Sequence, residues 1–249
     1  MNGPLQAFKF LSNGRGLFSD FDWPLPEHGN PGLWVTSDEP LETCLRGIHV
    51  CRESDLPYWI DDELWRVEVR GLIVEHETMM VAQEGRLLEK IECWDAAAAK
   101  RFAKDCALRA RSAAAESLRA VGRSGDATVL EATTDLDAIR EAAQVIVRGG
   151  PADGATVVAF AADATALARG ARPEAQRIDA PSFGAPSNGA VAANLAYVAA
   201  HVAGCTGGVP ESAGYQMAFD REREWQLEWF RNLIETPQLP RSVAPGQSE

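Results

Sequence analysis

The sequence predicts an α+β protein, with a β-rich domain over residues 1–95 followed by an Ala-rich α-helical domain over residues 96–235. Two observations support this division. Before Asp95, apolar side chains recur with a period of two between frequent Gly and Pro residues, as in half-buried strands. After Asp95, Ala-rich stretches follow the helical period of 3.6. Residues 236–249 are expected to form a disordered tail.

Alternating side chains predict the strands of the first domain. LQAFKF places Phe8 and Phe10 on one face, and LWRVEVR alternates three apolar with three charged residues. Further strands are expected in GLWVT, GIHVC, LIVEHETMMV and RLLEKIECW, with Gly71 and Gly85 separating strands. The segment SDLPYWIDDEL predicts a short helix or turn, capped by Ser54 or Asp55.

Capping residues and apolar periodicity predict the helices of the second domain. Asp95 is expected to cap a long first helix, and Thr134 or Asp135 a second one that runs to about residue 148. Further helices are expected over 190–204 and 215–234. Residues 153–171 fit either a helix or a buried strand, and residues 172–189 predict an exposed loop.

The final predicted helix has the clearest apolar face of the sequence. Trp225, Trp229 and Leu233 recur at i, i+4 and i+8, so this face is expected to be buried in the helical layer or in a dimer interface. The helical domain is therefore expected to bind a protein partner or a second copy of the chain.

Composition and charge argue against several classes of protein. Residues 1–95 carry 8 basic and 18 acidic side chains, which give a net charge of −10 within a total of −12. Such a field repels a phosphate backbone, so nucleic acid is a poor default partner. The sequence contains no run of 18 apolar residues, so no membrane-spanning helix is expected. The absence of a signal-like start and the five unevenly spaced cysteines favour a cytoplasmic protein with reduced thiols.

The segment CLRGIHVC concentrates the candidate chemistry. Cys44, His49 and Cys51 are the candidate metal ligands, because thiolate and imidazole groups bind zinc and residues two apart on a strand share a face. A catalytic Cys51–His49 pair is an alternative. The remaining interpretation is structural, with small buried cysteines and a hydrogen-bonded histidine. These residues leave the identity of any cofactor unknown.

The first 95 residues resemble a bacterial and phage domain family of unknown function that is common in actinobacterial hypothetical proteins. The resemblance rests on Phe8-Lys9-Phe10 and then on Cys44, Gly47, His49 and Cys51, which follow the pattern C-x-x-G-h-H-h-C. Asp55-Leu56 with Tyr58-Trp59, and the stretch from Glu63 through Gly71 to Ile73, continue it, whereas Met80 departs from the basic residue expected there. The resemblance implies a domain and no activity.

Three functions follow from these expectations. The first is a binding or accessory module that joins an acidic β-rich domain to a helical association domain. The second is an ADP-ribosyltransferase-like or RNA-phosphotransferase-like enzyme that uses NAD, with Lys9 and His49 as catalytic residues and Glu68 or Glu75 as the carboxylate; this is an analogy at the level of the fold. The third is a small zinc-binding domain. A cleft that holds Lys9, His49 and a carboxylate would favour the enzyme.

Overall fold

The structure is a computed structural model that describes residues 4–16, 21–38, 40–149, 157–159 and 187–236. It confirms the α+β class: a curled antiparallel sheet occupies residues 5–90, and helices follow within residues 96–235. The tail from residue 237, residues 172–186 of the predicted loop and most of the ambiguous segment 153–171 lie outside the described residues; within that segment, residues 157–159 are helical.

The sheet is curled because its two ends are joined by a bridge. Its strands are β1 (Leu5–Ser12), β2 (Arg15–Gly16), β3 (Val35–Thr36), β4 (Ile48–Val50), β5 (Glu63–Glu75) and β6 (Met80–Lys90). They are ordered β2-β1-β5-β6-β3, and β4 also pairs with β6. Directly after β4, Cys51 exchanges two backbone hydrogen bonds of 2.8 and 2.9 Å with Phe8 of β1. This pairing makes residues 5–90 a β half-barrel.

Two glycines inside the long strands allow the curl. The sequence predicts that Gly71 and Gly85 separate strands, but they lie within β5 and β6. Gly71 has a φ of +80° at a bulge where the β5–β6 register shifts, and a bulge bends its strand. At Gly85 of β6, a Cβ would lie 2.7 Å from Ile48 Cγ2, so only glycine allows β4 to lie this close to β6. The prediction of strand breaks was wrong, because glycine also serves where a sheet bends.

The segment LIVEHETMMV is a hairpin and not the single strand that its apolar ends predict. β5 ends at Glu75, and the His76 N–H donates to Met79 O at 2.9 Å to close the turn before β6. The predicted short helix is the 3₁₀ helix η1 (Glu53–Tyr58). Its first turn is stabilised by Asp55, whose carboxylate accepts from the Arg52 N–H at 3.1 Å.

The predicted alternation within the strands is confirmed and gives the sheet two buried faces. On the inner face, Ala7 and Leu11 of β1 pack with apolar residues of β4, β5 and β6. Lys9 lies between them on the same strand, with its amine 5.1 Å from the centre of the Trp23 ring. On the outer face, Phe10 belongs to the core that the sheet shares with the helices.

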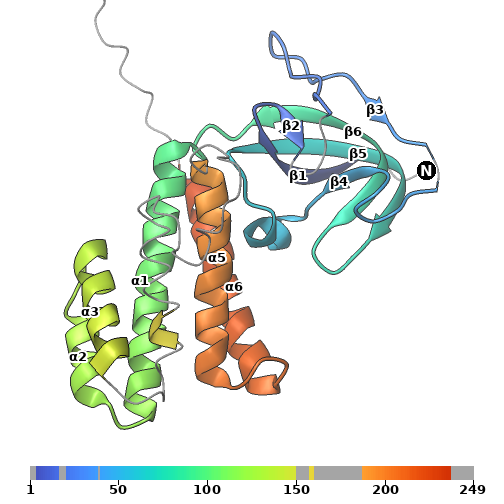
Figure 1. Cartoon of the computed structure of the whole chain (residues 1–249). Helices are drawn as coiled ribbons and strands as arrows, with labels where there is room; N and C mark the ends of the chain where they lie inside the picture. The colour runs from blue at the N-terminus through green and yellow to red at the C-terminus, as the bar shows by residue number, and fades with distance from the viewer. Residues whose placement is uncertain (1–3, 17–20, 39, 150–156, 160–186, 237–249) are drawn as a thin grey trace, which may run out of the picture.

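Five helices of the second domain are described with full bounds: α1 (Ala96–Ala120), α2 (Ser124–Glu131), α3 (Leu136–Gly149), α5 (Asn188–Gly207) and α6 (Ala213–Glu235). The predicted caps are confirmed, because the Asp95 carboxylate accepts from two N–H groups of α1 and the Asp135 carboxylate from two of α3. The sequence did not predict α2, whose only buried residues are Ala127 and Leu130. Figure 1 shows α1, α5 and α6 side by side, with α2 and α3 on the side of α1 away from the sheet.

One core crosses the boundary at Asp95. The buried Trp94 ring lies 5.0 Å from Phe230 of α6 and 6.0 Å from Phe10 of β1, measured between ring centroids. Phe102 of α1 lies 5.2 Å from Phe230. The Trp94 indole N–H donates to Asp61 O at 2.7 Å. The β half-barrel and the helical domain are thus held together by aromatic packing from four separate parts of the chain.

The buried face of α6 differs from the prediction. Glu222, Arg223, Gln226 and Phe230 are its buried residues, whereas the predicted Trp225–Trp229–Leu233 face is half-buried. Arg223 and Gln226 are hydrogen-bonded, although Nε of Arg223 has no hydrogen-bond partner among the described residues. Arg223 donates to Pro57 O and to Gln226 Oε1, both at 2.9 Å, and Gln226 donates to Ala196 O at 2.9 Å. The predicted face does pack against the core, but it is only partly buried. Hydrophobicity alone missed Glu222, Arg223 and Gln226, because polar side chains can be buried when they are hydrogen-bonded.

Helix α5 is a candidate membrane span by length and composition alone. Its most apolar window has a mean hydropathy of 1.2, and 44% of that window is buried inside the structure. A core helix of a soluble protein meets the same criteria. The contacts of α5 with α1 and α6 agree with such a core helix.

Candidate functional site

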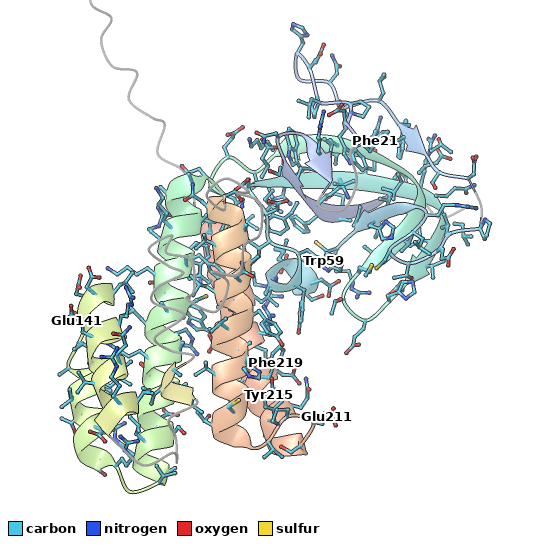
Figure 2. All side chains as sticks on the ribbon, viewed as in Figure 1. Phe21, Trp59, Glu141, Glu211, Tyr215 and Phe219 are labelled. Atoms are coloured by element: carbon cyan, nitrogen blue, oxygen red, sulfur yellow. The ribbon has the colours of Figure 1, made fainter. Side chains whose placement is uncertain are left out.

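A pocket of about 340 Å³ opens on the β half-barrel beside the predicted motif. Its lining residues include the aromatic residues Phe8, Phe21, Trp23 and Trp59. Figure 2 labels Phe21, beside the sheet, and Trp59, next to the short helix η1. The volume lies within the usual range of small-molecule sites, which are concave and mainly apolar with a few polar groups. This pocket is therefore the candidate site of the molecule.

Lys9 and His49, the predicted catalytic residues, both line this pocket. The Lys9 ammonium donates to the backbone oxygen of His49 at 2.7 Å and lies against the Trp23 ring. Burial lowers the pKa of Lys9 from 10.5 to about 8, because desolvation disfavours the charged amine. Lys9 is the only cationic Lys or Arg side chain among the described residues that line the pocket.

His49 is held by the backbone of its own motif. The Cys44 N–H donates to Nε2 at 2.8 Å, so Nδ1 carries the proton and donates to Gly47 O at 3.1 Å. Burial, followed by the charge of Lys9, lowers the pKa of His49, so the ring is neutral at pH 7. Gly47 has a φ of +125°, and a Cβ there would lie 2.3 Å from Val81 Cγ1. The motif glycine therefore serves a close approach between β4 and β6.

Cys51 is buried at the closure of the half-barrel. Its thiol donates to Phe8 O at 3.5 Å, beside the two backbone hydrogen bonds that join these residues. Burial raises the pKa of the Cys51 thiol to about 12. A thiol that stays protonated at neutral pH is a poor nucleophile, and this environment does not support the Cys51–His49 pair.

The three predicted metal ligands do not form a ligand cluster. Cys44 is exposed, Cys51 is buried, and both His49 nitrogens accept or donate backbone hydrogen bonds. In the part of the chain that the structure describes, no three His, Cys, Asp or Glu side chains are grouped so that they could hold a metal ion. The structure thus gives no support to the zinc site, which stays a prediction.

The predicted enzyme set is only partly brought together. The pocket holds Lys9 and His49, but no Asp or Glu is among its described lining residues. Glu68 is paired with Arg86 on the neighbouring strand, and Glu75 with Arg52. Both carboxylates that were expected to serve NAD-dependent chemistry are therefore in ion pairs and do not line the pocket.

Sequence reasoning missed most of the pocket wall. Phe21, Trp23, Thr36 and Leu45 line it but lie in loops or in the two-residue strand β3. The aromatic residues of the segment FDW were the available signal. A loop has no periodicity, so its sequence does not show which strand its side chains face.

Fold and site together define an α+β protein in which a β half-barrel with an apolar pocket leads into a helical domain. Comparisons of the chain with models of protein families, with curated proteins and with solved structures gave no match. The resemblance carried by Cys44, Gly47, His49 and Cys51 therefore stays a prediction.

Replacing Lys9 with Met should remove a pH-dependent part of the stability. In the wild type, the folded chain releases the Lys9 proton above about pH 8, whereas the unfolded chain holds it to pH 10.5. The free energy of unfolding of the wild type should therefore rise as the pH increases between these two values. Lys9→Met should be the more stable protein at pH 7, by up to about 3 kcal/mol at about 1.4 kcal/mol per pKa unit, and should lose most of this advantage by pH 10.

Urea unfolding of both proteins at pH 7 to 10 measures this effect. The raised pKa of Cys51 weakens folding above pH 9, where the unfolded thiol ionises. The charge of Lys9 also lowers the pKa of Cys51, so Lys9→Met changes this contribution, and the two proteins are best compared between pH 7 and 9. A difference that does not change with pH would contradict the lowered pKa of Lys9.

Proposed function

We propose that the protein is a binding module whose β half-barrel holds a small, mainly apolar ligand in the pocket beside Lys9 and His49. The observation that carries this proposal is the apolar character of both the walls and the opening. Phe21 and Leu45 line the pocket and yet are 45% and 76% exposed. Exposed large apolar side chains around a concave site are typical of ligand-binding surfaces.

Hydrogen bonds that join the pocket walls to the rest of the half-barrel support binding. Trp59 donates from its indole N–H to Thr78 O at 2.6 Å, which ties the end of η1 to the β5–β6 hairpin. Cys51, on another wall, belongs to the bridge that closes the half-barrel. A preformed pocket lowers the ordering cost of binding.

Filling the pocket tests this proposal. Thr36 lines the pocket from β3 and is itself exposed, so Thr36→Trp should fold normally and occupy the space of the ligand. The wild type should bind 1-octanol, measured by calorimetry, and Thr36→Trp should weaken binding at least tenfold. Asp38→Asn, an exposed change in the same segment that is not among the lining residues, is the control. Equal affinity in all three proteins would place the binding elsewhere.

We also propose that the helical domain associates with a second copy of the chain. The support is a groove of about 280 Å³ on α6, lined by Trp225, Trp229 and Leu233 with two polar residues. Half-buried tryptophans are frequent in protein interfaces. Sedimentation velocity should give a mass above the 26.9 kDa of one chain, and the mass of a single chain would argue against this association.

A further inference from the structure

We propose that the ligand of the half-barrel pocket is a carboxylate with an apolar body, and that its head group pairs with the Lys9 ammonium. This inference rests on the proposed binding function and names the chemical class of the ligand. The juxtaposition that supports it is a lone cation inside apolar and aromatic walls.

The first step concerns the partners of Lys9. Its ammonium has three N–H donors, and it donates to His49 O at 2.7 Å. The Trp23 ring, 5.1 Å away, contributes a cation–π contact but does not neutralise the charge. Burying a cation is costly unless it is paired, and no carboxylate is found among the described residues that line the pocket. An anionic ligand would provide the counter-ion that these walls lack.

His49 is the other basic side chain among the described residues that line the pocket. Both nitrogens of His49 are used by Cys44 and Gly47, so the ring is neutral and adds no second charge. One cation favours one anionic group, and a charge-assisted hydrogen bond between ammonium and carboxylate is stronger than one between neutral groups. The described lining therefore fits a monoanion better than a molecule with several charges.

The net charge of the chain and the apolar walls of the pocket together determine where an anion can bind. The chain as a whole carries a charge of −12, and its field disfavours anions at most of the surface. Apolar walls around Lys9 strengthen the local attraction, because a charge pair interacts more strongly where water is excluded. The rest of the ligand must then fill a space of about 340 Å³ between aromatic side chains, which calls for an apolar body.

Three probes with the same chain and different head groups test the inference: octanoate, 1-octanol and octylammonium. At pH 7 the wild type should bind octanoate at least tenfold more tightly than 1-octanol, and octylammonium most weakly. Lys9→Met keeps the side-chain length and removes the charge. It should lower the affinity for octanoate at least tenfold and abolish the preference for octanoate over 1-octanol. Lys9→Arg keeps the cation and should retain the preference for octanoate.

The possible outcomes separate this inference from the proposed function. Suppose that octanoate and 1-octanol bind with equal affinity, and that this binding is unaffected by Lys9→Met but lost in Thr36→Trp. This result would overturn the inference that the ligand is a carboxylate, and it would still support the proposed binding module. No binding of any probe would overturn both. A preference for octanoate that persists in Lys9→Met would also overturn the inference, because the anion would then be recognised by another group.

Discussion

Phe230→Ala is expected to lower the free energy of unfolding by about 3–5 kcal/mol, the usual cost of truncating a fully buried Phe. Phe230 is 0% exposed and contacts Trp94, Phe102 and Phe10. These partners come from the β half-barrel, from α1 and from the link between them. The cavity should therefore weaken both parts of the molecule at once.

Urea unfolding followed by circular dichroism and by tryptophan fluorescence measures this effect. Circular dichroism reports mainly on the helices, whereas tryptophans lie in both parts of the chain. The two signals should change together in the wild type and in Phe230→Ala, because one core joins the parts. Met217→Ala, an exposed residue of the same helix, should shift stability by less than about 0.5 kcal/mol. Two separate transitions, with only the helical one shifted, would contradict the shared core.

Gly189→Ala is expected to destabilise the protein by about 2–3 kcal/mol, because α5 meets the half-barrel without room for a side chain. A Cβ at this position would lie 2.3 Å from the backbone carbon of Asp61 and 2.4 Å from the Asp62 nitrogen. The Gly189 N–H also donates to the Asp62 carboxylate at 2.9 Å. Since the obstacle is backbone and not a flexible side chain, the start of α5 must move away.

The matched control is Gly125→Ala in α2. No atom lies within 4 Å of a Cβ built there, and Gly125 is exposed. Alanine is the better helix former by about 1 kcal/mol, so this variant should be as stable as the wild type or more stable. Thermal unfolding of both variants is the measurement. If Gly189→Ala is as stable as Gly125→Ala, the close contact between α5 and residues 61–62 is not present in solution.

The strands and helices that the sequence predicted correctly are those with strong local signals. Trp65, Val67 and Val69 alternate with charged residues, and Asp95 and Asp135 cap their helices as expected. The errors arose where a residue has two possible roles. Gly71 separates strands in some proteins and bends one strand here. Gly189 belongs by composition to the exposed loop, yet it is buried in a helix against the half-barrel.

The candidate site was predictable only in part. The motif directed attention to Lys9 and His49, which do meet in one pocket. The pocket itself depends on Trp23, Thr36 and Trp59, which reach it from separate loops and strands. Their convergence follows from the pairing of strands that are distant in sequence, and the period of a single segment does not contain this information.

The sequence by itself determined the α+β class, the change of character at Asp95, the alternation in β1 and β5 and the caps of α1 and α3. These features depend on neighbours within a few residues, so periodicity and capping chemistry suffice to predict them. Only the tertiary structure decided that Cys51 closes the half-barrel against Phe8, that Arg223 and Gln226 lie on the buried face of α6, and that Lys9 faces a pocket. Each of these depends on hydrogen bonds or packing between segments that the fold alone brings together.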